Sequence, residues 1–264
     1  MVSNGLYKPE FEHDSCGVGF VANIKGNKSH QIISDALTIL ENMEHRGACG
    51  SESNTGDGAG IMIQVPHEFF FAECVKLGVH LPAFGRYGVG VIFFPKELRL
   101  REECREIFAR AAEKLGLEIL TYRKVPVNTF DIGPTALSVE PEMEQVFIAC
   151  PDHIDNPEEF ERKLFVLRNY ATHTINNTVK KDAIGFYIAS LSYKTVSYKG
   201  QLTSHQVRTY FTDLTNKRVV SAFGLVHSRF ATNTFPSWKL AQPFRYIAHN
   251  GEINTLQGNL NWLK

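Results

Sequence analysis

The sequence lacks an excess of charge of either sign. Lys and Arg together number 28, and Asp and Glu together also number 28, in a chain of 264 residues. A protein that attracts nucleic acid or an anionic membrane surface carries clustered basic charge in excess. The composition therefore predicts neither of these partners.

Long apolar runs are absent as well. None approaches the roughly 20 residues that a membrane-spanning helix needs, so no membrane-embedded segment is predicted. Residues 1–15 contain Lys8, Glu10, Glu12 and Asp14 and no apolar stretch. This composition excludes a secretory signal peptide at the start of the sequence.

Cysteines are few and dispersed. Their number is odd, and no two of them form a Cys-x-x-Cys pair; they are Cys16, Cys49, Cys74, Cys104 and Cys150. This pattern excludes a disulfide framework and a zinc ribbon, and it is typical of a protein in the reducing cytoplasm. Histidines and cysteines do not fall at metal-ligand spacings on one predicted element, so we expect no metal site. The glycine-rich stretch 53–61 lacks the Gly-Lys-Ser/Thr of a phosphate-binding loop and leads into a strand, which excludes that motif.

Hydrophobic residues make up 43% of the chain, enough to bury a substantial core. Apolar residues three and four apart predict helices over 29–45, 67–77, 98–115 and 156–175, with Ser29 and Asn156 as the N-terminal caps of the first and the last. Apolar runs predict strands over 16–24, 61–65, 88–94, 145–150, 183–191, 195–199, 219–230 and 245–250. Strands in adjacent groups between helices favour a layered α+β fold over strict β-α alternation. The stretch 251–264 is predicted to turn into a helix and stops inside it, so we expect the chain to be a fragment.

Cys16 follows the polar leader 1–15 and precedes a predicted strand. It has three interpretations. A lone cysteine is most often a small buried hydrophobic residue. It could instead be a nucleophile with His13 as its base. If the Ser15–Cys16 bond were cut, the new α-amino group, with a reference pKa of about 7.7 to 8.0, could take the thiol proton. Local sequence alone leaves all three open.

Two later stretches also carry polar groups suited to chemistry. "HSRFATNTFPSW", residues 227–238, contains Arg229, whose planar guanidinium suits a carboxylate. It could equally be a strand end with a surface salt bridge. "AHNGEIN", residues 248–254, contains the dipeptide Asn250-Gly251, which is a strong turn signal. A side-chain amide beside an unhindered backbone N–H is also what an oxyanion hole requires.

Read together, these stretches resemble one family. "CGVGF", "LENMEHRGA", "TGDGAG" and "HSRFATNTFPSWKLAQPFRYIAHNGEINTLQGNLNW" are similar, in the same order, to the amino-terminal glutaminase domain of glutamate synthase large subunits. That domain is a class II glutamine amidotransferase and an N-terminal-nucleophile hydrolase. The resemblance runs from Cys16 to the last residue, and it implies a four-layer αββα sandwich that is incomplete at its C-terminal end. It also implies a leader or propeptide at 1–15 and an amidotransferase domain over 16–264.

The resemblance implies roles for individual residues. Cys16 would be the nucleophile, freed by removal of the leader, and would form a γ-glutamyl thioester from glutamine. The Asn250 side chain and the Gly251 N–H would form the oxyanion hole. Arg229 would bind the α-carboxylate of glutamine. Phe230 and Thr232 would lie in the same substrate-binding loop. Structural roles are expected for Arg46 and Asp57, in loops that shape the pocket of the nucleophile.

The family also implies parts that these residues do not supply. A carboxylate that holds the α-amino group of glutamine would lie beyond Lys264. So would the ammonia channel and the FMN and iron–sulfur cluster of the full-length enzyme, and we expect no cofactor site in this chain. The implied partners are downstream synthase domains or a reductase subunit that supplies electrons. Ammonia would pass to 2-oxoglutarate. Two alternatives are a stand-alone glutaminase subunit and an unprocessed, inactive binding module.

Overall fold

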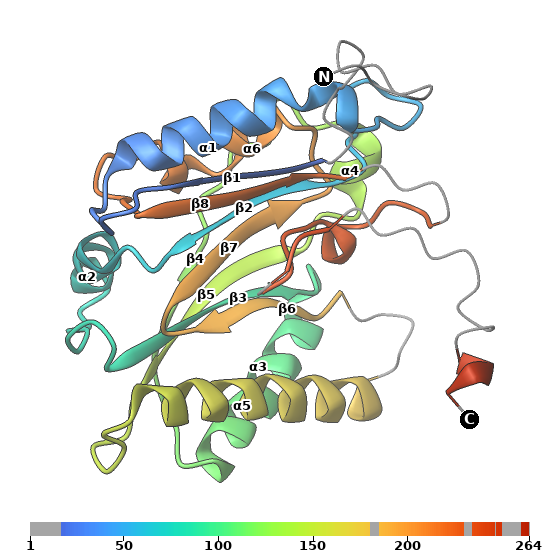
Figure 1. Cartoon of the computed structure of the whole chain (residues 1–264). Coiled ribbons are helices and arrows are strands. Elements are labelled where there is room, and N and C mark those ends of the chain that lie inside the picture. The colour runs from blue at the N-terminus through green and yellow to red at the C-terminus, as the bar shows by residue number, and fades with distance from the viewer. Residues whose placement is uncertain (1–16, 180–184, 230–233, 246, 250–259, 264) are drawn as a thin grey trace.

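A computed structural model describes residues 17–179, 185–229, 234–245, 247–249 and 260–263. Within these ranges the chain forms two antiparallel sheets of four strands each, flanked by helices (Figure 1). This arrangement confirms the predicted α+β class. In the same part of the chain, no helix is both long enough and apolar enough to cross a bilayer.

The first sheet holds the candidate site at one end. Its strand order is β1-β8-β2-β7, and these strands are Val18–Ala22, Phe223–Ser228, Ala59–Gln64 and Thr195–Gly200. In one row across this sheet, Val18 pairs with His227, His227 with Gly60, and Gly60 with Lys199. Strands from the beginning, the middle and the end of the chain are therefore neighbours.

The second sheet has the order β4-β5-β3-β6. Its strands are Glu118–Lys124, Glu142–Ala149, Tyr87–Phe94 and Tyr187–Ser192. Every residue of β3 is buried, as expected for a central strand that is covered on both faces. β6 leads directly into β7, so the β6–β7 connection joins the two sheets covalently.

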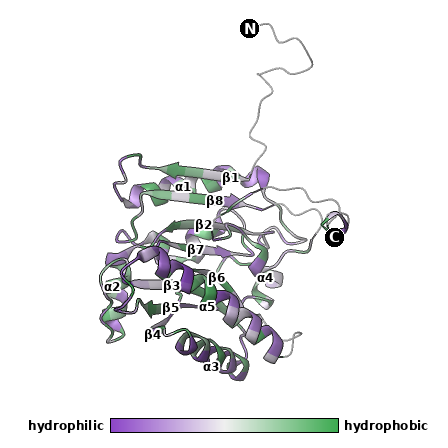
Figure 2. Ribbon diagram, turned by 60° about the horizontal axis from the view of Figure 1, so that its bottom comes forward, coloured by the Kyte–Doolittle hydropathy of each residue, from purple (hydrophilic) through white to green (hydrophobic). Residues whose placement is uncertain are grey.

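The helices lie on the two outer sides of this pair of sheets. Figure 1 shows α1 and α6 beside the first sheet and α3 and α5 beside the second. In Figure 2, α3 and α5 carry both hydrophilic and hydrophobic residues, as amphipathic helices do. The bounds are α1 His30–Asn42, α2 His67–Lys76, α3 Leu98–Lys114, α4 Pro134–Ser138, α5 Pro157–Thr178 and α6 Gln206–Tyr210, with 3-10 turns at Glu44–Arg46, Thr212–Thr215 and Trp238–Leu240.

Local chemistry explains where two of the helices begin. The Ser29 hydroxyl accepts a hydrogen bond from the Ile32 N–H at the start of α1, and the Asn156 side chain accepts one from the Glu158 N–H at the start of α5. Both caps were predicted from the sequence.

The buried apolar side chains form two cores. One core joins α1 and α2 to both sheets, and the other lies between the second sheet and helices α3 and α5.

One predicted strand is wrong, and one strand was missed. In the run 245–250, the residues that the structure describes, 245 and 247–249, belong to no strand: Phe244 and Ile247 exchange backbone hydrogen bonds across a tight turn, and Arg245 has a φ of 24°. Phe244 and Ile247 pair with each other and not with a sheet. β4, Glu118–Lys124, was missed because its uncharged run, 119–122, is short and is flanked by charged residues.

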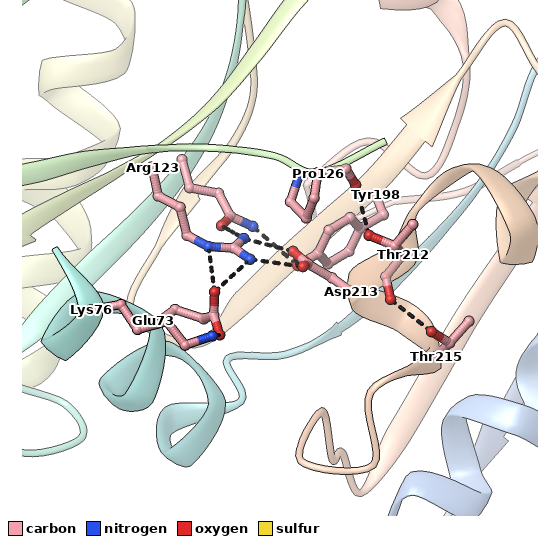
Figure 3. A network of polar contacts seen from close by, with 9 residues as sticks. Glu73, Lys76, Arg123, Pro126, Tyr198, Thr212, Asp213 and Thr215 are labelled. Atoms are coloured by element: carbon pink, nitrogen blue, oxygen red, sulfur yellow. Dashed lines mark hydrogen bonds and ion pairs between the residues drawn. The ribbon is translucent and has the colours of Figure 1, made fainter. Parts of the chain in front are cut away.

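A buried polar network ties β4 to the first sheet and to the 3-10 turn at 212–215 (Figure 3). Arg123 donates to both carboxylate oxygens of Asp213 at 2.8 Å, to Gln145 at 2.8 Å and to Glu73 at 3.1 and 3.3 Å. Tyr198 on β7 donates to Asp213 at 3.1 Å. Burial alone would raise the pKa of Glu73, but the Lys76 hydrogen bond and the Arg123 charge outweigh it and lower that pKa.

Candidate active site

The candidate site lies where β8 ends, at His227, Ser228 and Arg229. The Ser228 N–H donates to the Gly17 carbonyl at 2.7 Å, so the residue before β1 is tied to the end of β8. The Arg229 N–H donates to the Gly58 carbonyl at 2.8 Å, which joins the glycine-rich loop to the same point. His227 and Ser228 are almost fully buried. This end of the first sheet is thus a closed corner built from three distant segments.

Arg229 is held in this corner by two partners. Its Nη1 donates to the Asp57 carboxylate at 2.9 Å and to the Asp57 carbonyl at 3.1 Å, and its Nη2 donates to the Thr234 hydroxyl at 2.6 Å. The side chains of Arg229 and Asp57 are only 11% and 4% exposed. A guanidinium has five N–H donors, and toward the described residues Arg229 uses three of them, which fix the orientation of the group.

The glycines of the loop allow this close packing. A Cβ on Gly56 would lie 2.0 Å from the Leu202 carbonyl carbon, and a Cβ on Gly47 would lie 2.6 Å from the Ser228 hydroxyl. Gly58 has a φ of 142°, a conformation that residues with a Cβ rarely adopt. The sequence predicted that the loops around Arg46 and Asp57 shape a pocket. These contacts place Gly47 and Gly58 against the residues at the end of β8.

His249 is anchored beside the same corner. Its carbonyl accepts hydrogen bonds from His227 Nε2 at 3.0 Å and from Gln242 Nε2 at 2.9 Å, and its N–H donates to Gln242 Oε1 at 2.9 Å. Lys199, which is 1% exposed, donates to the Ala241 carbonyl at 2.7 Å. No role was predicted for Gln242 or Lys199. Lys199 is the last residue of the predicted strand 195–199, and lysines are mostly exposed, so the sequence offered no signal of its burial.

A comparison with protein families decides the affiliation. The family model described as glutamine amidotransferases class-II matches residues 16–264. The chain belongs to the class-II glutamine amidotransferases. This confirms the resemblance drawn from the sequence motifs, and the match begins at Cys16.

Relatives of this amidotransferase chain are much longer proteins. It is 45% identical over 262 residues to the glutamate synthase [NADPH] large chain of Bacillus subtilis, covering 99% of this chain and 17% of the relative. It is 48% identical to the glutamate synthase [NADH] of Schizosaccharomyces pombe, covering 99% of this chain and 12% of that protein. It is 40% identical to the chloroplastic ferredoxin-dependent glutamate synthase 2 of Arabidopsis thaliana, covering 96% of this chain and 15% of that protein. The chain thus spans less than a fifth of each of these relatives.

Of the site residues predicted for the amidotransferase, the structure describes Arg229. Cys16, Phe230, Thr232, Asn250 and Gly251 lie outside the described residues, as does the leader 1–15. Their bonded neighbours are described, however. Gly17 follows Cys16 and His249 precedes Asn250, and both are hydrogen-bonded to consecutive residues of β8. The structure therefore brings the flanks of the predicted nucleophile and oxyanion residue together with Arg229.

Of the cysteines that the structure describes, three are poor nucleophiles, and the fourth, Cys49, lines the small cavity beside Arg229 and Ser228. Burial raises the pKa of Cys74 to about 12 and that of Cys104 to about 11, so both are thiols at neutral pH. Burial also raises the pKa of Cys150. Cys49 is exposed. Within the described ranges, no three His, Cys, Asp or Glu side chains are grouped to hold a metal ion.

Cavities at this site are small. A space of about 30 Å³ lies against Arg229 and Ser228 and is closed by Gly47, Gly58 and Ser204. Larger cavities of about 410 and 490 Å³ lie away from it, at the ends of β3 and β5. Chemistry and not cavity size therefore marks the candidate site: a fixed guanidinium, two buried β8 residues and the flanks of Cys16 and Asn250 meet there.

Proposed function

We propose that this chain is the glutamine-hydrolysing domain of a glutamate synthase. The observation that carries the proposal is the convergence of Gly17, Arg229 and His249 at the end of β8, in a chain that belongs to the class-II glutamine amidotransferases. The similarity to glutamate synthases over at least 96% of the chain supports the synthase rather than another amidotransferase. The order of helices and sheets in Figure 1 supports the finer fold assignment, the four-layer αββα sandwich of N-terminal-nucleophile hydrolases.

Cys16 is the proposed nucleophile. After removal of residues 1–15, its α-amino group takes the thiol proton, and the thiolate attacks the side-chain amide carbon of glutamine. Ammonia leaves and a γ-glutamyl thioester remains, which water hydrolyses to glutamate. The tie between Gly17 and Ser228 supports this role, because it anchors the first residue after Cys16 next to Arg229.

Arg229 is the proposed ligand of the glutamine α-carboxylate. The pairing with Asp57 supports this role, because a guanidinium that is already oriented loses less conformational entropy when a ligand binds. Phe230 and Thr232 follow in the same loop and are proposed to contact the substrate. The Asn250 side chain and the Gly251 N–H are proposed to donate to the oxyanion of the tetrahedral intermediate.

In the full-length protein, the ammonia is proposed to react with 2-oxoglutarate, with electrons supplied by downstream domains or a reductase subunit. FMN and the iron–sulfur cluster are assigned to regions outside this chain. No observation favours the stand-alone glutaminase or the inactive binding module. The cytoplasmic location expected from cysteine use stays a prediction.

Glutamine hydrolysis by the purified full-length protein tests the proposal. Cys16→Ser should lower ammonia release by about a thousandfold or more, whereas Cys49→Ser, a change at an exposed cysteine, should leave it intact. Intact-mass analysis should show loss of residues 1–15, and 6-diazo-5-oxo-norleucine should label Cys16. Normal activity in Cys16→Ser would refute the assignment. Release of ammonia without glutamate formation from 2-oxoglutarate and a reductant would favour the stand-alone glutaminase.

A further inference from the structure

The loop 241–249 has an unusual closure. Phe244 and Ile247 exchange both backbone hydrogen bonds, from Phe244 N–H to Ile247 O at 2.8 Å and from Ile247 N–H to Phe244 O at 2.6 Å. In a regular antiparallel hairpin, the next pair outward, 242 and 249, would exchange backbone hydrogen bonds in the same way. Here the Gln242 side chain makes that exchange with the His249 backbone. A side-chain amide has the same donor and acceptor as a peptide group, so it replaces the missing backbone partner.

Gln242 is itself fixed from several sides. The residue is buried, with only 7% of its surface exposed. The Lys199 ammonium donates to the carbonyl of the preceding residue, Ala241, at 2.7 Å. The Gln242 carbonyl lies over Gly60 of β2, where a Cβ would come within 2.6 Å of it. The first sheet therefore holds the backbone of Gln242 while its side chain holds His249.

The contacts at His249 determine the orientation of one peptide unit. The His249 carbonyl receives two N–H donors, from Gln242 and from His227, which use both of its lone pairs. The carbonyl oxygen, the following nitrogen and the following Cα lie in one plane. Fixing the direction of this carbonyl therefore fixes the plane of the bond that enters residue 250. His227 also pairs with Val18 in β1. The residue that binds the His249 carbonyl is therefore itself held beside the strand that follows Cys16.

We propose that Gln242 is a positioning residue for the oxyanion hole: it holds the backbone of His249, the residue that directly precedes Asn250. This inference rests on the proposed function, because it assumes that Asn250 donates to the oxyanion. Gln242 acts through the His249 peptide and does not itself touch glutamine. An oxyanion donor contributes mainly in the transition state, so its misorientation lowers kcat more than it changes KM.

Gln242→Leu in the full-length protein tests the proposal, since leucine keeps most of the volume and removes both hydrogen bonds. We expect kcat for glutamine hydrolysis to fall by about 10- to 100-fold, less than the ~10²–10³-fold loss on removing an oxyanion donor itself. KM for glutamine should change less than about threefold. The matched control is Gln145→Leu, at a glutamine with 0% exposure whose side chain bonds to Arg123 and Tyr198. It should lower the melting temperature and leave kcat of the folded protein unchanged.

A second variant separates positioning from a general loss of packing. Gln242→Glu keeps an acceptor for the His249 N–H and replaces the amide donor by an ionised carboxylate that repels the His249 carbonyl. On protonation, the introduced carboxyl can donate to that carbonyl again. The ratio of the variant kcat to the wild-type kcat should therefore rise as the pH falls, and a merely structural role would not produce this trend.

The outcomes separate the two proposals. Wild-type kcat in a folded Gln242→Leu variant, or equal losses of kcat in Gln242→Leu and Gln145→Leu, would overturn the role of Gln242. A rise in KM with unchanged kcat would overturn it too, because that pattern indicates lost substrate binding. If the wild-type protein hydrolyses no glutamine, or Cys16→Ser remains active, the proposed function itself fails.

Discussion

Two buried arginines of this molecule differ in how their donors are used. Arg123 and Arg229 have nearly the same side-chain exposure, 9% and 11%. Arg123 makes five hydrogen bonds, one for each N–H, to two carboxylates and an amide. Toward the described residues, Arg229 makes three, all from its two terminal nitrogens, to one aspartate and one hydroxyl.

On the proposed function, this difference separates a structural cation, Arg123, from the ligand proposed for the substrate, Arg229. A guanidinium with every donor used has nothing to offer a ligand and acts as a cross-link inside the fold. A guanidinium fixed by one carboxylate, with donors remaining, is oriented for a second anion. Burial alone would not distinguish the two arginines, whereas the number of donors in use does. Substitutions at each arginine and at its neighbours test this distinction.

The largest effect is expected from Arg123→Met. The substitution leaves Asp213 buried, with a side chain 3% exposed, and removes its cationic partner. Breaking a buried ion pair on one side costs about 3–5 kcal/mol. Urea unfolding should show a loss of stability of that order, while KM for glutamine in the folded fraction stays the same. A stability within about 1 kcal/mol of wild type would mean that the network is not a structural cross-link.

Arg229→Lys should have the reciprocal effect. A lysine ammonium can still meet Asp57, so the melting temperature should change little, but it cannot bind the substrate carboxylate with two parallel N–H groups. KM for glutamine should rise by about 10- to 100-fold with kcat within about threefold, which corresponds to one charge-assisted hydrogen bond. The control is Arg123→Lys, which should lower stability and leave KM unchanged. An unchanged KM in Arg229→Lys would remove the substrate role.

Lys199 is a buried lysine whose amino group is held by carbonyl oxygens. Burial lowers its pKa well below the usual 10.5. Between the lowered folded-state pKa and 10.5, the unfolded chain binds a proton that the folded chain does not, so stability rises with pH across that window. Lys199→Met should remove this rise, which amounts to at most about 1.4 kcal/mol per pH unit. Urea unfolding from about pH 7 to 10 measures it, with Lys25→Met, at an exposed lysine, as the control that keeps the rise.

Glu73→Gln should have the smallest effect. The pKa of Glu73 is lowered in the folded protein, so its contribution to stability is present above the usual 4.5 and is lost as pH falls through the lowered value. The variant should lose less stability than wild type on acidification, by about 1 kcal/mol or less, because Glu73 is at the edge of the network. Identical acid unfolding curves would show that the two hydrogen bonds from Arg123 to Glu73 contribute nothing to stability.

The sequence predicted the elements whose signals are local. The helices at 30–42 and 157–178 were predicted together with their caps, because spacing and cap residues lie within one element. The glycine-rich loop was also placed correctly. However, β2, the strand that follows this loop, begins at Ala59, inside the stretch 53–61. It begins there because its partners on β7 and β8 extend the pairing to that residue.

Features that depend on distant partners could not be predicted. Nothing near Gln242 in the sequence indicates that its amide replaces a backbone partner of His249. The run 245–250 has the composition of a strand, yet its described residue Ile247 pairs with Phe244 across a tight turn. Arg229 was singled out by its motif, but its pairing with Asp57 was not foreseen. That pairing depends on the fold bringing residues 57 and 229 together.

The pairing of β1 with β8 has a consequence for the order of events during folding. The candidate site needs residues that follow the leader, a loop near residue 57 and a strand that ends at residue 228. Contacts between such distant segments form late, because the loop-closure entropy must be overcome before they give any stabilisation. On the proposed function, a nascent or partly folded chain therefore has Cys16 without Arg229 beside it to bind glutamine. Glutamine hydrolysis would then depend on completion of the fold, so the topology itself would keep the thiol from acting early.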